Sequence, residues 1–286
     1  MKRILLIFIV LCYNCDTGNL NVVATLPNTL YEASGIETTP NSDLIWMLND
    51  GGNKPELFGL NDTGDIIKTL KIKAKNNDWE DLTTDKKGNI YIGDFGNNAN
   101  KRKNLAILKV DKDSLNNSGK IKIERISFYY PNQKKFPPKK RKQMHFDCEA
   151  FFHFNDSLYL FTKSRERNNF GKTNLYKIPA KRGNHEAQFM TSFKTCSDIQ
   201  CWVTSADISA DRKQVAVLSP KGVWVFSNFK EDDFFNGSVI KHEFSFESQK
   251  ESVCFKDKNT LLITDEKAHG RGGKMYEFKL NEIQTN

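Results

Sequence analysis

The chain has 286 residues, of which 38% are hydrophobic and 12% aromatic, and it carries a formal net charge of +8. This length is ample for one large apolar core, and the aromatic content argues against a disordered chain. The positive charge suits anionic partners, but the sequence has no helix-turn-helix or zinc-finger motif, so we expect no nucleic-acid partner.

The first residues are typical of an export signal. Lys2 and Arg3 precede the apolar run ILLIFIVL, which is too short to span a bilayer. Cys15 follows LCYN, which loosely resembles a bacterial lipoprotein cleavage site. We therefore expect residues 1–15 to be a signal peptide or a lipoprotein leader. The mature protein would be a lipoprotein of the outer membrane or cell surface, or a periplasmic or secreted protein, with a membrane contact only through a lipid on Cys15.

Residues 19–286 have the pattern of a single all-β domain. Short runs rich in Val, Ile, Leu, Phe and Tyr alternate with turns rich in Asn, Asp, Gly and Lys. The runs group into five units, which begin at EASGIE, EDLTTD, EAFFHF, SADISA and ESVCFK. The fifth unit has no fourth strand, and NLNVVATL at residues 19–26 can supply it and close the ring.

The sequence therefore predicts a five-bladed β-propeller that is closed by an N-terminal strand. A six-bladed ring with one degenerate blade, placed in the long connection between the second and third units, is the alternative. The centre of that connection, PNQKKFPPKKRKQ at residues 131–143, has no apolar pattern for a strand. We expect it to be a solvated loop.

Polar residues recur at one register of the five units. Each unit contains a pair of such residues. The second residue of the pair lies fourteen positions after the first in four units, and eighteen positions after it in the first unit. The pairs are Glu32 and Asp50, Glu80 and Asp94, Glu149 and Lys163, Ser205 and Ser219, and Glu251 and Asp265. The first strand of a propeller blade is the innermost one, so the first residues should surround one mouth of the central channel.

Four carboxylates at one channel mouth would repel one another. Two charges about 4 Å apart cost roughly 4 kcal/mol at an effective dielectric constant near 20. Either the pKa values rise or a cation lies among the acids. Oxygen ligands favour calcium over zinc, and magnesium demands stricter geometry. The predicted calcium ligands are Glu32, Glu80, Glu149, Ser205 and Glu251. The alternative is that each acid only accepts hydrogen bonds from backbone amides at the end of an inner strand.

The loops that follow the second strands should lie on the same face as these acids. Three of these loops begin at an acid that is the second residue of its pair. We expect these acids to lie behind the metal ligands: Asp50, Asp94 and Asp265. Their basic residues would form a rim for an anion such as a phosphate or a carboxylate: Arg102, Arg165, Arg167, His269 and Arg271. The alternative is that loop tips are commonly basic in a chain of this charge. The glycines of DGG and DFGNN suit tight turns with positive φ.

The cysteines outside the leader fall into two kinds. Cys196 and Cys201 are close enough in sequence for a local disulfide in an oxidising compartment. Cys148 and Cys254 lie in segments that we expect to form inner strands of different blades. We interpret them as buried thiols rather than as a bridge between blades.

Several of these segments resemble known families. EASGI, LNDGGN, DWEDL, IGDFGNN and DCEAF resemble secreted bacterial propellers related to the esterase-like domain of phytase, over roughly residues 30–170. The order Glu, Glu, Glu, Ser, Glu at the inner positions is similar to the calcium-activated apyrases, five-bladed enzymes that hydrolyse nucleoside diphosphates. That resemblance implies that the same five residues are calcium ligands. The gluconolactonase-like propellers are a third, more distant resemblance.

Two functions are compatible with this sequence. The first is an exported calcium-binding propeller that acts as an extracellular binding or scaffold module for an anionic small molecule or surface glycan. The second is a calcium-dependent hydrolase of phosphoric esters or anhydrides. In the hydrolase the metal would polarise a phosphoryl oxygen and orient water, while Arg102, Arg165 and Arg271 neutralise charge.

Overall fold

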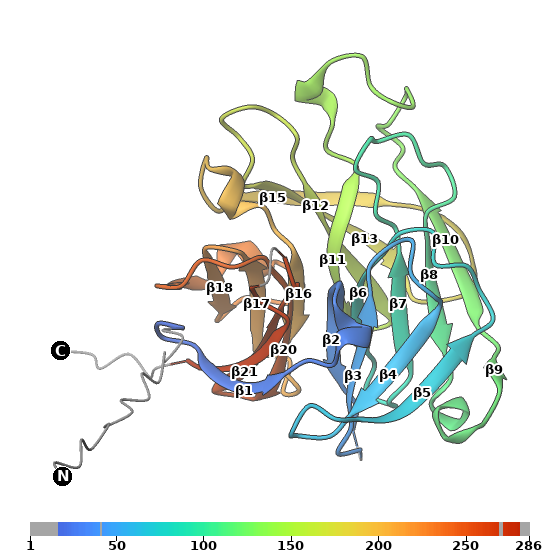
Figure 1. The fold of residues 1–286 in the computed structure, drawn as a ribbon. Helices are drawn as coiled ribbons and strands as arrows, with labels where there is room; N and C mark the ends of the chain where they lie inside the picture. The colour runs from blue at the N-terminus through green and yellow to red at the C-terminus, as the bar shows by residue number, and fades with distance from the viewer. Residues whose placement is uncertain (1–16, 41, 269–270, 281–286) are drawn as a thin grey trace, which may run out of the picture.

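Five small sheets surround a common centre in the computed structural model, which describes residues 17–40, 42–268 and 271–280 (Figure 1). The fold is the predicted five-bladed β-propeller, and the six-bladed alternative is wrong. The described helices are short 3-10 turns: η1 (Asn28–Leu30), η2 (Lys112–Asn116), η3 (Arg141–Gln143), η4 (Ile199–Cys201) and η5 (Phe234–Asn236). None of them has the length and apolar character that crossing a membrane requires.

The first three blades each consist of four antiparallel strands that follow one another from the centre outwards. The first blade contains β2 (Ala33–Thr38), β3 (Ile45–Asn49), β4 (Glu56–Leu60) and β5 (Ile66–Ile72). The second contains β6 (Trp79–Thr84), β7 (Ile90–Asp94), β8 (Ala106–Val110) and β10 (Glu124–Tyr129). The third contains β11 (Asp147–Phe154), β12 (Ser157–Lys163), β13 (Lys172–Pro179) and β15 (Gln188–Lys194).

The fourth blade has the same order, and the fifth combines both ends of the described chain. The fourth contains β16 (Ser205–Ile208), β17 (Gln214–Ser219), β18 (Gly222–Ser227) and β19 (Ser238–Glu243). The fifth contains β20 (Lys250–Asp257), β21 (Thr260–Asp265), β22 (Lys274–Lys279) and β1 (Asn21–Thr25). β1 pairs antiparallel with β22, as predicted for the closing strand.

Two further strands, which the sequence did not predict, cover the outer edges of the first two blades. β9 (Lys120–Ile121) pairs parallel with β5, and β14 (Gly183–Glu186) pairs parallel with β10. Each comes from the blade that follows in the chain. An added strand satisfies the backbone groups that an outer edge would otherwise expose, and here it also ties neighbouring blades together.

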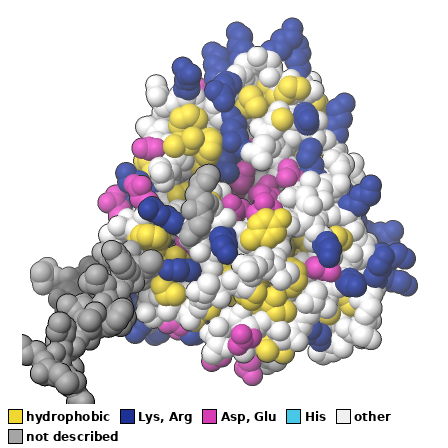
Figure 2. All heavy atoms as spheres, in the orientation of Figure 1, with side chains coloured by type: hydrophobic (Ala, Val, Ile, Leu, Met, Phe, Trp, Pro, Cys, Tyr) yellow, Lys and Arg dark blue, Asp and Glu magenta, His cyan; other side chains and the backbone are white. Residues whose placement is uncertain are grey.

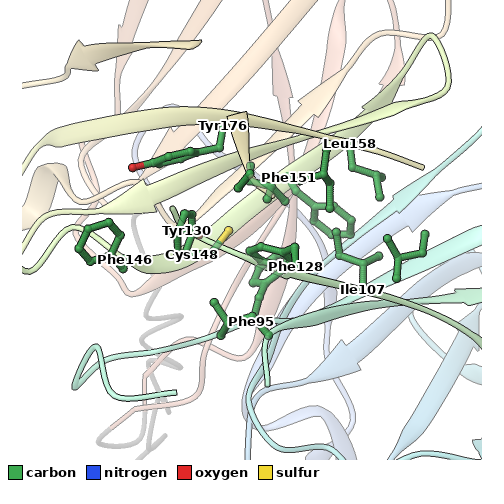
Figure 3. Close-up of a cluster of buried hydrophobic side chains, with 14 of the residues drawn as sticks. Phe95, Ile107, Phe128, Tyr130, Phe146, Cys148, Phe151, Leu158 and Tyr176 are labelled. Atoms are coloured by element: carbon green, nitrogen blue, oxygen red, sulfur yellow. The ribbon is translucent and has the colours of Figure 1, made fainter. Parts of the chain in front are cut away.

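The apolar core lies between adjacent blades. The innermost strands β2, β6, β11, β16 and β20 contact one another in turn around the whole ring. Between the second and third blades, aromatic rings from both sheets interlock (Figure 3), with Phe95 and Phe151 packed edge to face at 5.1 Å between ring centroids. Cys148 belongs to this cluster as a free buried thiol, and Cys254 is a free buried thiol as well.

Two predicted loops are present. The connection between β10 and β11 contains no strand and projects beyond the sheets, in green at the top of Figure 1. The loop before β16 contains the predicted disulfide between Cys196 and Cys201.

Candidate metal centre at one mouth of the channel

Four of the five innermost strands carry a β-bulge close to their first residue. A bulge leaves one residue out of the strand pairing and changes the direction of its side chain. The bulged segments contain Ser34 in β2, Glu80 in β6, Glu149 in β11 and Glu251 in β20. All four side chains line one mouth of the channel, together with Thr204, which precedes the regular strand β16.

The predicted register is therefore wrong in the first and fourth blades. Glu32 precedes β2, where Asn53 Nδ2 donates to its carboxylate at 2.5 Å, and Ser34 occupies the ring position instead. Ser205 lies one residue deeper than Thr204, and its Oγ donates to Asp81 at 3.1 Å. In the fourth blade the reason is that β16 lacks the bulge of the other inner strands, and in the first blade the bulge lies at Ser34 rather than at Glu32.

A hollow of about 380 Å³ occupies this mouth. Its charged lining consists of the carboxylates and cations Asp50, Glu80, Glu149, Glu251, Glu266, Lys163 and Arg165. Figure 2 shows acidic side chains grouped near the middle of the face in view, with Lys and Arg side chains spread towards its periphery. The centre of the face is thus acidic although the chain as a whole is basic.

Two of these acids and one acid beside the hollow have the spacing of a metal site. Asp50, Asp78 and Glu80 each offer a carboxylate oxygen, and these three oxygens lie within 4.8 Å of one another. Hard divalent cations such as calcium take ligands of this kind in flexible geometry. Asp78 was not predicted, although it lies two residues before Glu80 in the segment NNDWED.

Two glycines allow the three carboxylates to approach. A Cβ atom at Gly51 would lie 2.5 Å from Asp78 Oδ1, and one at Gly96 would overlap Glu80 Oε1 and lie 2.7 Å from Asp78 Cγ. Gly52 differs, because it has φ of +84° and open space around it. The predicted turn role thus applies to Gly52, whereas Gly51 and Gly96 leave room for the acids.

Asn76 holds the first and second blades in register at this point. Its Nδ2 donates to the carbonyl oxygens of Asn49 at 3.2 Å and Asp50 at 2.7 Å, and its Oδ1 accepts from Trp79 N at 3.0 Å. These bonds join the end of β3 to the start of β6. They set Asp50 beside Asp78 and Glu80.

The carboxylates at the mouth have raised pKa values. Burial, together with the charges of neighbouring carboxylates, raises the pKa of Asp50 to about 7 and that of Glu266 to about 8. Burial also raises the pKa of Glu80 and Glu149 well above the usual range for a glutamate. In the absence of a cation the mouth therefore retains protons near neutral pH.

Lys163 places a positive charge among the carboxylates at the mouth. Its Nζ lies 2.9 Å from Glu149 Oε1, although that oxygen accepts no hydrogen bond of ordinary geometry from a described residue. Burial opposes the charged form of Lys163, but the charges of Glu149 and Glu251 outweigh it and raise its pKa. The sequence pairs Lys163 with Glu149, but the predicted metal site did not include a lysine.

Trp202 forms one wall of the hollow. The centre of its indole ring lies 5.2 Å from Lys163 Nζ and 4.6 Å from the Arg165 guanidinium carbon. Its Nε1 donates to Ser164 O at 2.6 Å. Arg165 also pairs with the buried carboxylate of Asp147.

Most of the predicted rim does not face the hollow. Arg102 Nη2 donates to Asp94 Oδ1 at 2.9 Å and its Nη1 donates to Gly96 O at 2.7 Å, so both Arg102 and Asp94 stabilise the loop after β7. Asp265 is buried and accepts from Tyr276 OH at 2.7 Å. None of these three lines the hollow.

Of the remaining predicted rim residues, only some line the hollow. Arg167 and Arg271 are exposed and lie outside the lining, whereas Arg165 belongs to it. His269 lies outside the described residues. The predicted basic rim thus contributes a single arginine to the hollow among the residues that the structure describes.

Comparison with known proteins identifies the fold but not a family. No family model and no curated protein sequence matches the chain. Among solved structures, a protein assigned as a gluconolactonase matches with a TM-score of 0.51 and 10% identity, over 89% of this chain and 76% of that one. A gluconolactonase from Xanthomonas campestris matches with a TM-score of 0.48 and 11% identity, over 88% and 73%.

A propeller of another kind gives a similar result. The Cps50 (Swd1) β-propeller domain of Myceliophteria thermophila matches with a TM-score of 0.45 and 9% identity, over 92% of this chain and 100% of that one. The structural neighbours are thus β-propellers, including the gluconolactonase-like proteins expected as a distant resemblance. At such low identity the likeness shows the fold alone. The resemblances to phytase-related propellers and to apyrases stay predictions.

Proposed function

We propose that this protein is a calcium-binding propeller, in which Asp50, Asp78 and Glu80 hold the cation at the mouth of the channel. The observation that carries the proposal is the convergence of three carboxylate oxygens within 4.8 Å, where two glycines make room for them. A divalent cation would replace the protons that the raised pKa values keep on these acids. Calcium suits the all-oxygen ligand set better than zinc, which recruits His or Cys.

The bound cation would make the mouth a site for an anionic ligand. Without metal, five carboxyl groups and only two basic side chains line the hollow, so it offers little positive charge to an anion. With metal, the cation, Lys163 and Arg165 together provide positive charge on one side of the hollow. We therefore propose that an anionic small molecule or the end of a surface glycan binds here only when calcium is present, with Trp202 as an apolar wall.

Calcium titration followed by calorimetry and thermal unfolding tests the proposal. We expect calcium to bind the chelator-treated wild-type protein and to raise its melting temperature, since a ligand that binds only the folded state stabilises it. Asp78→Asn should abolish both effects. The matched control is Asp62→Asn, which removes the same charge from an exposed turn and should leave both effects unchanged. A wild-type protein that neither binds calcium nor gains stability from it would contradict the proposal.

A calcium-dependent hydrolase of phosphoric esters or anhydrides is the second candidate. It is favoured by the Glu149–Lys163 ion pair, which lines the same hollow as two of the metal-site carboxylates, Asp50 and Glu80. There the metal would polarise a phosphoryl oxygen and orient water, and Lys163 and Arg165 would stabilise the developing negative charge.

Release of phosphate from nucleotides and aryl phosphates separates the two candidates. Lactones belong in the same substrate panel because the structural neighbours include gluconolactonases. For a hydrolase, Lys163→Met should abolish turnover and leave calcium binding intact, and a chelator should abolish turnover of the wild type. No turnover on any of these substrates, with calcium bound, would favour the binding module.

We also propose that the protein is exported. The disulfide between Cys196 and Cys201 supports an oxidising compartment. The leader and Cys15 lie outside the described residues. Mass spectrometry of the mature N-terminus from membrane and soluble fractions would distinguish a lipid on Cys15 from simple secretion, and an uncleaved cytoplasmic chain would contradict export.

A further inference from the structure

A second hollow, separate from the mouth, has lysines as half of its lining residues. It has a volume of about 550 Å³ and lies within the loop between β10 and β11. The cations that line it are Lys134, Lys135, Lys139, Lys140 and Lys142. Between residues 125 and 146 the sequence contains no Asp or Glu. This lysine hollow therefore concentrates the positive charge of the chain at one place.

The loop that forms the lysine hollow is held firmly at both ends. Near its start, Gln133 is buried and its Nε2 donates to Asn100 O at 2.7 Å. At its end, Phe146 N donates to Asn100 Oδ1 at 2.9 Å. Met144 O accepts from Arg165 N at 3.0 Å. Both ends of the loop are thus fixed, which reduces the entropy that would be lost when a ligand orders the lysines between them.

The charges of the hollow are not neutralised within the protein. All five lysines are exposed, and in the described part of the chain no carboxylate oxygen lies within 4.0 Å of their ammonium groups. Arg102 and Arg165, by contrast, are paired with buried aspartates. Several like charges around one hollow repel one another, so a polyanion that enters would relieve that repulsion and release counterions.

We propose that the lysine hollow binds an anionic polysaccharide, that is, a sugar chain bearing sulfate or carboxylate groups. A flexible chain can enter a concave site, whereas the flat surface of an anionic membrane cannot follow the walls of a hollow. Single-stranded nucleic acid is read by aromatic platforms, and the aromatic residue that lines the hollow, Phe146, is buried in the core. Lysines also supply point charges rather than the bidentate geometry with which arginine selects phosphate.

The proposal does not depend on the calcium site. No residue that lines the lysine hollow also lines the mouth or belongs to the three metal-site carboxylates. Binding at the lysine hollow should therefore persist in a chelator and in the Asp78→Asn variant. This makes its failure distinguishable from the failure of the proposed function.

Heparin is the probe for the test, with uncharged dextran as the neutral sugar chain. We expect heparin to bind the wild-type protein in low salt, to weaken as salt is added, and to bind equally well with calcium or a chelator. The variant with all five lysines changed to glutamine should bind heparin at least about tenfold more weakly. The control variant changes five exposed lysines near β5 and β9 to glutamine and should bind within about threefold of wild type: Lys71, Lys73, Lys75, Lys120 and Lys122.

A second measurement keeps the test valid if the variant folds poorly. On the wild-type protein, heparin should protect the five lysines of the hollow from acetylation, as read by mass spectrometry, and leave the control lysines reactive. The proposal is overturned if both sets are protected equally, if the control variant loses as much affinity as the hollow variant, or if single-stranded DNA or vesicles of anionic lipid bind more tightly than heparin.

Discussion

The acids of the channel form two layers that do different work. At the mouth, no hydrogen bond from a described residue reaches the carboxylates of Asp78 and Glu80, which lie close to each other and to Asp50. The Arg102 guanidinium lies 3.8 Å from Asp78 Oδ2. One step deeper, Asp81 accepts hydrogen bonds from Leu82 N at 2.9 Å and from Ser205 Oγ at 3.1 Å.

The deeper layer joins the blades through backbone amides. Asp81 also accepts from Phe151 N of the next inner strand at 3.3 Å, and Asp207 accepts from Phe255 N at 2.8 Å. This is the structural role that the sequence offered as the alternative to a metal site. The metal-site interpretation therefore applies to the acids at the mouth, and the hydrogen-bonding interpretation applies to the deeper acids. The two kinds of acid can be neighbours in sequence because adjacent side chains in a strand point in different directions.

The largest expected effect separates the two layers directly. Asp81→Ala leaves buried amides without an acceptor and should lower the free energy of unfolding by about 3 to 5 kcal/mol. Glu80→Gln should change it by less than about 1 kcal/mol in a chelator, because the raised pKa keeps Glu80 protonated there and glutamine has the shape of the protonated acid. Urea unfolding of both variants measures the difference. Equal losses for the two substitutions would show that the layers are not distinct.

The pH dependence of stability should also differ between the metal-free and calcium-loaded protein. The pKa values of about 7 for Asp50 and about 8 for Glu266 exceed those of the unfolded chain, so the folded state binds more protons. Their contribution is present below about pH 4 and is lost as the pH rises through about 8. We expect metal-free stability to fall by a few kcal/mol between these values.

Calcium should flatten this decline, because the cation compensates the charges that deprotonation creates. Thermal unfolding at pH 5 and pH 8, with and without calcium, provides the measurement, and Glu266→Gln should remove part of the decline without metal. A metal-free protein that becomes more stable as the pH rises across this range would contradict the assigned charge states.

A smaller effect is expected at the glycines. A methyl group at Gly96 would displace Glu80 and Asp78, so Gly96→Ala should cost about 1 to 3 kcal/mol and prevent calcium binding. Gly52→Ala should cost about 1 to 2 kcal/mol through its positive φ, but should leave calcium binding unchanged. Calorimetry on both variants tests the pair, and calcium binding by Gly96→Ala would show that close approach is not required.

The blade pattern was predictable because it depends on alternating apolar residues and turns, which are local features. The closing strand at Asn21–Thr25 followed from the missing strand of the fifth blade. The added strands β9 and β14 were missed because Lys120–Ile121 and Gly183–Glu186 have no strand pattern of their own, and β14 is largely exposed.

The site was less predictable because its geometry depends on the bulges. In each bulged strand a buried apolar residue follows the mouth residue by two positions, as Ile36 follows Ser34 and Val253 follows Glu251. Alignment on these apolar residues would have replaced Glu32 by Ser34. Asp78 and Glu266 come from loops outside the repeated strand register, so no repeat could have identified them.

A crystal structure of the protein grown with calcium tests the central claim most directly. We predict one ion at the channel mouth, bound by oxygens of Asp50, Asp78 and Glu80 at about 2.3 to 2.6 Å, with anomalous scattering that identifies it as calcium. An empty mouth at saturating calcium, with Lys163 filling the space between these carboxylates, would contradict the account.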